Sequence, residues 1–89
     1  MIIKKVKVIN KLGLHARASS KLTQLASQFN SEIFISHNNN KVNSKNILDV
    51  LMLAASMGSE LEIQASGADE KNAIYQIEKL FNDYFNEGE

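Results

Sequence analysis

Two periods of hydrophobicity alternate along this chain of 89 residues, and their order limits the folds that it can adopt. Apolar and polar side chains alternate with period two, as in half-buried strands, in three stretches: around Val6 and Val8, along 32–36 and along 60–65. Apolar residues recur at helical spacing in three others: 16–29, 47–52 and 68–85. The short run 41–43 fits the return strand of a hairpin. The predicted order is therefore β-α-β-β-α-β-α.

Four strands and three helices in this order favour one architecture. We predict an α+β open-faced β-sandwich, with a four-stranded antiparallel sheet and three helices on one face. The length suits one small domain, residues 1–89. Ser19 is expected on the polar side of the first helix. The residues expected to face the core are Ala18, Leu22, Leu25, Ala26 and Phe29 in the first helix, Leu61, Ile63 and Ala65 in the last strand, and Ala73, Ile74, Ile77, Leu80, Phe81 and Tyr84 in the last helix.

Turn and cap residues mark the boundaries of these elements. The Asn run 38–40 indicates the hairpin turn, because Asn tolerates left-handed backbone angles. His37, beside this run, is expected to be a solvent-exposed turn residue. Asn43 or Ser44 is the predicted cap of the second helix, and Gly58 is its predicted end.

The composition excludes several classes of protein. The absence of cysteine rules out disulfides and thiolate metal sites. Lys+Arg and Asp+Glu balance at 10 each, which argues against a nucleic-acid partner. Lysines interrupt the apolar residues at the N-terminus, unlike those of a signal peptide, and no apolar run approaches the roughly 18 residues of a membrane span. We therefore expect a soluble, cytoplasmic protein with no nucleic-acid or membrane partner.

One histidine stands where the first strand ends and the first helix begins. His15 follows Gly13, which permits a sharp turn, and precedes Arg17. A residue that caps a helix lies beside backbone N–H groups without an intrahelical partner, here those of Ala16 and Arg17. These donors and the helix dipole favour an anion such as phosphate, and the Arg17 guanidinium can bind two phosphoryl oxygens at once. The segment is thus suited to hold a phosphoryl group on a histidine nitrogen.

The same residues also fit simpler roles. A lone histidine near an arginine is common, and His15 is compatible with a plain helix cap or a surface residue. A metal site is not expected, because His37 is the only other histidine and no cysteine or spaced carboxylate accompanies His15. A serine hydrolase is not supported, since no Gly-x-Ser-x-Gly segment occurs.

The segment from Asn10 to Ser19, at this distance from the N-terminus, resembles the active-site signature of the HPr family. These proteins are the histidine-containing phosphocarriers of the bacterial phosphotransferase system. The similarity extends to the length, the element order, the run from Ser44 to Leu48 and the run from Gly67 to Glu70. The start of the segment and the Phe-rich C-terminal helix are similar to proteobacterial members, including the nitrogen-related branch called NPr.

The resemblance implies that His15 accepts a phosphoryl group on Nδ1 from enzyme I, which phosphoenolpyruvate charges, and passes it to a IIA protein. The residue that matches Arg17 steadies the phosphoryl group. Such a protein is a carrier rather than an enzyme, and we expect a monomer without a cofactor. Which IIA protein is the acceptor, and whether sugar uptake or nitrogen-type regulation is served, stays open.

The resemblance also implies a docking patch formed by the second helix and the histidine surface. The matching residues are Ile47, Leu48, Leu51 and Met52, with Ser20 and Lys45 beside them. The stretch 47–54 is apolar except for Asp49, which is more than one buried face requires, so part of it is expected to be exposed. Val50 and Leu53 are expected in the core.

Two residues depart from the family pattern. Ala18 stands where the family usually has proline, and we expect this change to be tolerated. Asn46 stands where some members carry a serine that a kinase phosphorylates, which puts that control in doubt. Ser44 is expected to cap the second helix rather than to replace that serine. Two other functions stay open: a regulatory module that acts by docking, and a domain in which His15 and Arg17 bind an anion noncovalently.

Overall fold

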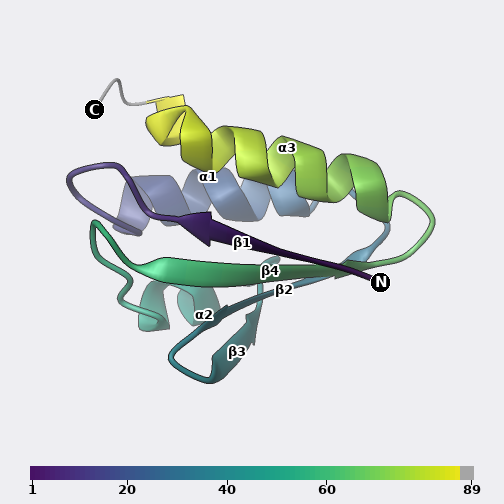
Figure 1. Cartoon of the computed structure of the whole chain (residues 1–89), viewed down its shortest axis with the longest axis horizontal. Coiled ribbons are helices and arrows are strands. Elements are labelled where there is room, and N and C mark those ends of the chain that lie inside the picture. Colours follow the sequence, from purple (N-terminus) through teal and green to yellow (C-terminus); the bar gives the residue numbers. More distant parts are fainter. Residues whose placement is uncertain (87–89) are drawn as a thin grey trace.

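The computed structural model of the chain describes residues 1–86 and confirms the predicted element order (Figure 1). The elements are β1 (Ile2–Lys7), α1 (Ala16–Ala26), β2 (Glu32–His37), β3 (Asn40–Asn43), α2 (Ile47–Met52), β4 (Glu60–Ser66), α3 (Glu70–Asn82) and a short 3₁₀ turn, η1 (Tyr84–Asn86). Among these described residues, no helix combines the length and the apolar character that crossing a membrane requires. Of the predicted domain 1–89, residues 87–89 lie outside the described part.

The strands form one antiparallel sheet in the order β1-β4-β2-β3. The first strand therefore pairs with the last, and Val6 lies opposite Leu61. Ile63 of β4 lies opposite Ile35 of β2 in the same way, so the apolar side chains of the alternating strands share one face. The three helices cover this face, as predicted for an open-faced sandwich, and in Figure 1 the strands lie in front of α1 and α2.

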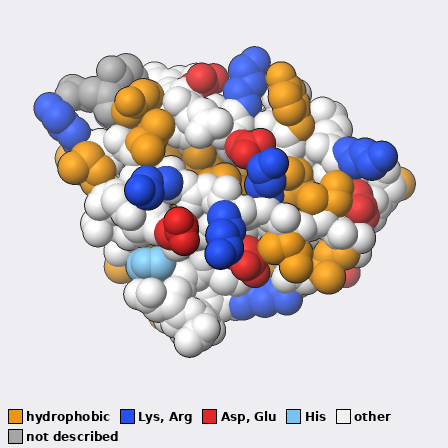
Figure 2. Space-filling view, in the orientation of Figure 1, with side chains coloured by type: hydrophobic (Ala, Val, Ile, Leu, Met, Phe, Trp, Pro, Cys, Tyr) orange, Lys and Arg blue, Asp and Glu red, His pale blue; other side chains and the backbone are white. Residues whose placement is uncertain are grey.

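The other face of the sheet is open. Lys5 lies opposite Glu62 and Lys7 opposite Glu60 on β1 and β4. Figure 2 shows basic and acidic side chains close together on this face. Opposite charges on paired strands stabilise a sheet modestly, and lysines on an edge strand such as β1 discourage pairing with another chain.

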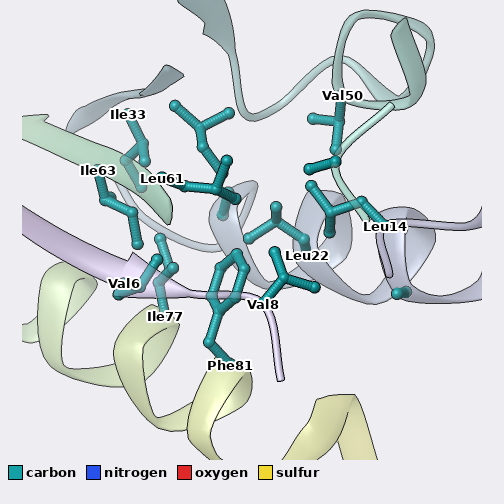
Figure 3. Close-up of a cluster of buried hydrophobic side chains, with 14 of the residues drawn as sticks. Val6, Val8, Leu14, Leu22, Ile33, Val50, Leu61, Ile63, Ile77 and Phe81 are labelled. Carbon is teal, nitrogen blue, oxygen red and sulfur yellow. The ribbon is translucent and has the colours of Figure 1, made fainter. Parts of the chain in front are cut away.

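One apolar core lies between the sheet and the helices (Figure 3). Side chains of Val6 and Ile63 from the sheet meet those of Leu22 from α1 and of Ile77 and Phe81 from α3. Each of these side chains is buried, which confirms the inward faces predicted from the two periods. Three residues of the predicted stripes only border this core, half-buried: Leu25, Phe29 and Leu80.

The end of the last helix differs from the prediction. Helical spacing placed Tyr84 in the core, but Tyr84 is 38% exposed and Phe85 is fully buried. The backbone φ angles of Tyr84, Phe85 and Asn86 are 57°, 53° and 63°, so the chain leaves the α-helix after Asn82 and turns Phe85 inward. The Phe85 ring packs edge-on against Phe81, with centroids 4.7 Å apart. Burial of a second aromatic ring offsets the cost of the left-handed turn.

The boundaries of the second helix are also corrected. Its cap is Asn46, whose side chain accepts hydrogen bonds from the N–H groups of Leu48 and Asp49, and not Asn43 or Ser44. Ser44 is buried, and its main-chain N–H donates to the Ile33 carbonyl at 2.9 Å. α2 ends at Met52, before Ala54 enters the left-handed region at a φ of 51°, and not at Gly58.

Two polar residues lie elsewhere than predicted. Ser19 is fully buried rather than on the polar side of α1, because its hydroxyl donates to the Leu14 carbonyl at 3.1 Å. His37 is the last residue of β2 and is half-buried, not an exposed turn residue. Its Nδ1 lies 3.3 Å from the carbonyl oxygen of Leu53, at the end of α2. Both residues satisfy main-chain carbonyls that the sequence pattern does not reveal.

Asp69 ties the start of α3 to the loop between α1 and β2. Its carboxylate accepts hydrogen bonds from the N–H groups of Asn30, at 2.8 Å, and of Ser31, at 2.9 Å, and from the Ser31 hydroxyl. These hydrogen bonds, of which the one from the Ser31 hydroxyl has the largest effect, hold the pKa of Asp69 below its ordinary value of 3.8. The ionised carboxylate therefore stabilises the folded chain.

This contact gives the stability of the fold a pH dependence. The pKa of Asp69 is lower in the folded than in the unfolded chain, so its contribution is present above pH 3.8 and is lost as the pH falls through the lower folded value. Asp69→Asn should therefore lower the free energy of unfolding at neutral pH, and the difference from the wild type should shrink in acid. Urea titrations at several pH values measure this.

Asp83→Asn, at the other end of α3, is the matched control, and its difference from the wild type should be smaller at neutral pH. If Asp69→Asn lowers the free energy of unfolding by the same amount at neutral pH and in strong acid, the pH dependence does not come from Asp69.

Candidate functional site

His15 is the N-cap of α1, as the sequence predicted. Its backbone is extended, with φ −75° and ψ −177°, and its side chain is half-buried. The ring makes no capping hydrogen bond to α1, all of whose residues are described. The imidazole therefore lies at the N-terminus of α1 and does not cap the helix with its side chain.

The first turn of α1 offers backbone donors beside this ring. The first intrahelical hydrogen bond runs from the Ser19 N–H to the His15 carbonyl, at 2.8 Å. The N–H groups of Ala16, Arg17 and Ala18 precede it and have no carbonyl of α1 to bind. Within this described turn there is no acidic side chain, and the Arg17 side chain is exposed. Donors, dipole and guanidinium therefore favour an anion next to His15.

A tight loop fixes the position of His15. Gly13 has a φ of +66°, and a Cβ at this residue would lie 2.5 Å from the carbonyl oxygen of Ala55. The N–H of Leu14 donates to the same carbonyl at 2.9 Å. Leu14 is buried, and Figure 3 shows its side chain beside Val50 of α2. The loop before α1 therefore rests directly on the segment that follows α2.

Asn10, the first residue of the segment 10–19, lies in this loop, and the sequence pattern predicted no role for it. It is fully buried, and its Nδ2 donates to the Gly13 carbonyl at 2.9 Å. Nδ1 of His15 lies 3.1 Å from the same carbonyl oxygen. A polar residue at the end of a strand, three positions before a turn glycine, was the signal that could have found it.

The apolar residues of α2 divide as predicted between surface and core. Val50 and Leu53 are buried, whereas Leu48 is 67% and Met52 81% exposed. Ile47 is also exposed, and Leu51 is half-buried. α2 therefore presents an apolar surface near the loop that carries His15. The exposed side chains of Leu12 and Met57, in loops on either side of the Gly13–Ala55 contact, were not predicted.

Two polar residues, Lys45 and Ser20, were also predicted to take part in docking. The Lys45 Nζ donates to the Phe29 carbonyl at 2.7 Å, beyond the C-terminal end of α1. An 11-residue helix separates this end from His15 by about 16 Å, so the structure does not bring the Lys45 ammonium to the histidine. Ser20, in α1, is half-buried and accepts a hydrogen bond from Gln24 at 3.3 Å.

The described residues contain no group of three or more His, Asp or Glu side chains that could hold a metal ion. His37 binds a carbonyl near the end of α2, as described above, and its contact with Leu53 does not involve the His15 loop. The site therefore consists of one imidazole, one guanidinium and a helix N-terminus.

A family model, curated relatives and solved structures all place this chain with the same family of proteins. A family model described as "PTS HPr component phosphorylation site" matches residues 2–83. The chain is 49% identical to the phosphocarrier protein HPr of Neisseria meningitidis serogroup A and 46% identical to that of Cupriavidus necator, in each case over 89 residues and the full length of both chains. A crystal structure of HPr from Thermoanaerobacter tengcongensis superimposes with a TM-score of 0.95 at 37% identity, covering 98% of each chain.

Two glycines test how tightly the histidine loop is fixed. Gly13 and Gly58 both have a positive φ, but a Cβ at Gly58 would have no atom within 4 Å. Gly58→Ala should cost about 1–2 kcal/mol of stability, from backbone strain alone. Gly13→Ala should cost about 1–3 kcal/mol more, because the Ala55 carbonyl must also move. Thermal unfolding of both variants measures the difference, and equal losses would show that the close approach to Ala55 does not matter.

Proposed function

We propose that this chain, which belongs to the HPr family of phosphocarrier proteins, accepts a phosphoryl group on His15 and passes it to another protein. Members of this family are components of the bacterial phosphotransferase system and are carriers rather than enzymes. The observation that carries the assignment to His15 is its place at the N-terminus of α1, beside backbone donors and Arg17. Residues 1–89 then act as a single domain and as a monomer.

The chemistry needs little from the protein beyond position and charge. A neutral imidazole nitrogen attacks phosphorus, and the bond from phosphorus to the donor breaks as the new N–P bond forms. The N–H groups of Ala16 and Arg17 lie where they can stabilise the phosphoryl oxygens. The Arg17 guanidinium, exposed and permanently charged, can close over them from outside. The phosphohistidine divides one transfer into two reversible steps.

The partners follow from this chemistry. Enzyme I, charged by phosphoenolpyruvate, is the proposed donor, and a IIA protein is the proposed acceptor. Sugar uptake or nitrogen-type regulation would differ only in which IIA protein receives the group. Because phosphoenolpyruvate is a cytoplasmic metabolite, the proposed place of action is the cytoplasm. The carrier itself needs no cofactor.

Both partners must dock where His15 is accessible. The exposed residues Leu48 and Met52, with Ile47 and Leu51, form an apolar surface near the histidine loop. Exposed apolar clusters of this kind are typical of protein interfaces. Ser20, half-buried on α1, is a further proposed docking residue. Lys45 is a weaker candidate for direct contact, since its ammonium binds the Phe29 carbonyl.

Regulation by a serine kinase is not expected at the start of α2. Asn46 cannot be phosphorylated and instead caps the helix with its side-chain oxygen. Ser44 is 1% exposed, so a kinase would have to unfold the segment to reach it. Its burial leaves this chain without an accessible serine next to the cap.

The first test is phosphorylation by enzyme I and phosphoenolpyruvate. The wild type should gain the mass of one acid-labile phosphoryl group, and His15→Ala should gain none, because no other side chain replaces the nucleophile. His37→Ala, which removes the other histidine, is the matched control and should be phosphorylated in full. Intact-protein mass spectrometry measures the gain. A mass increase that survives in His15→Ala would exclude His15 as the acceptor.

Arg17→Lys in the same assay separates charge from geometry. Lysine keeps the charge but cannot bind two oxygens at once, so transfer should slow while the melting temperature stays unchanged. Equal transfer rates for Arg17→Lys and the wild type would contradict the proposed role of Arg17.

The docking surface is tested with two exposed residues on different helices. Leu48 is 67% and Tyr75 61% exposed, but only Leu48 lies on α2. Leu48→Asp should raise the KM of enzyme I for the carrier by about tenfold, the loss expected for an interface residue worth about 1.4 kcal/mol. Tyr75→Asp, on α3, should leave the KM unchanged. Steady-state transfer assays measure both, and equal effects would mean that α2 is not the docking surface.

A further inference from the structure

Asn10 is a buried residue that holds the loop before His15 by two hydrogen bonds to Gly13. It is fully buried, and its main-chain carbonyl accepts a hydrogen bond from the Gly13 N–H at 3.2 Å. Its side-chain Nδ2 donates to the Gly13 carbonyl at 2.9 Å. Both polar groups of the Gly13 main chain are thus bound by the same residue, which fixes the direction of the Gly13 carbonyl.

This carbonyl has a second neighbour, the Nδ1 of His15, at 3.1 Å. A carbonyl oxygen has two lone pairs and can accept two hydrogen bonds but donate none. Nδ1 must therefore carry the hydrogen in this contact, and in the neutral ring Nε2 holds the lone pair. The contact therefore favours the tautomer of the unphosphorylated ring that carries its hydrogen on Nδ1.

We propose that Asn10 is a positioning residue, which aims the Gly13 carbonyl at His15 Nδ1 and thereby raises the phosphoryl-transfer potential of the phosphorylated protein. The proposal rests on the function proposed above, with the phosphoryl group on Nδ1. Asn10 does not touch the phosphoryl group. It acts only through the carbonyl that it holds.

The transfer step shows why the contact matters. When phosphorus is transferred to Nδ1, the N–P bond forms as the bond to the donor atom breaks. Solvent first moves the proton from Nδ1 to Nε2, which frees the Nδ1 lone pair for phosphorus; after transfer the ring releases that proton to solvent while the donor atom takes one up, so protons balance. The phosphorylated nitrogen no longer has a hydrogen to donate to the Gly13 carbonyl. The partial negative charge of this carbonyl oxygen then repels the negatively charged phosphoryl oxygens.

The hydrogen bond from Nδ1 to Gly13 therefore exists in only one of the two states. An interaction confined to the unphosphorylated state shifts the equilibrium toward that state by its own free energy. A hydrogen bond of ordinary net strength corresponds to about a threefold to tenfold change in an equilibrium constant. The contact thus favours release of the phosphoryl group to the next protein.

The chain offers a matched control for Asn10. Ser19 is also fully buried, and its hydroxyl donates to the neighbouring carbonyl, that of Leu14, at 3.1 Å. Ser19→Ala and Asn10→Ala each remove one buried side-chain bond to this loop. Only Asn10 binds the carbonyl that faces Nδ1. A purely structural role for Asn10 would make the two variants alike.

The equilibrium test uses catalytic enzyme I and a fixed ratio of phosphoenolpyruvate to pyruvate, with the phosphorylated fraction read by mass spectrometry. Asn10→Ala should raise the ratio of phosphorylated to unphosphorylated protein by about threefold to tenfold over the wild type. Ser19→Ala should leave the ratio at the wild-type value. Equal ratios in the wild type and Asn10→Ala would overturn the proposal, as would the same rise in Ser19→Ala.

A second measurement does not depend on phosphorylation. ¹⁵N spectra of histidine-labelled protein at alkaline pH, where the ring is neutral, should show a protonated Nδ1 in the wild type and in Ser19→Ala. Asn10→Ala should move the proton toward Nε2. An unprotonated Nδ1 in the wild type would overturn the proposal even if Asn10→Ala does not fold. If the spectra agree but no protein is phosphorylated, the proposed function fails and the positioning role of Asn10 on the ring stands.

Discussion

The contact between the Gly13–Leu14 loop and the Ala55 carbonyl is the interaction on which the rest of the site depends. It places a left-handed glycine against another main chain, with the Leu14 N–H 2.9 Å from the Ala55 oxygen and no room for a Cβ at Gly13. The loop before α1 and the loop after α2 are far apart in the sequence, yet this contact holds them side by side. The loop that leads to His15 consequently lies directly against the segment that follows α2.

A phosphocarrier must hold its phosphoryl group firmly enough to carry it and loosely enough to release it. In the function proposed for this chain, the N-terminus of α1 would supply the holding interactions, through main-chain N–H groups that have no carbonyl partner within the helix. The Gly13 carbonyl, which Asn10 and the His15 ring both contact, would supply the opposing interaction that we propose, present only without the phosphoryl group. Both sets of groups belong to the backbone, so the balance between them depends on loop geometry more than on the identity of exposed side chains.

Much of this arrangement could be predicted from the sequence. The alternation along 60–65 and the helical spacing along 16–29 give the strands, the helices and most of the core, because side-chain direction follows directly from the local period. His15 was predictable as a helix cap, since Gly13 and the apolar stripe of α1 define where the helix starts. The exposure of Leu48 followed from an excess of apolar residues that one buried face cannot hold.

The errors arose where a main-chain turn or a main-chain carbonyl, and not the spacing of apolar residues, determines the local structure. The pattern along α3 placed Tyr84 in the core, but a left-handed turn brings Phe85 against Phe81 instead. Ser19 is polar and yet buried, because the Leu14 carbonyl needs a donor.

The sequence by itself determined the element order, the family resemblance and the residues that can carry the chemistry, because these follow from residue type and spacing along the chain. Only the tertiary structure decided that Asn10 and His15 share the Gly13 carbonyl and that Lys45 is held away from the histidine. Hydrogen bonds to main-chain carbonyls depend on where the backbone lies in space, and no pattern of side chains specifies that position.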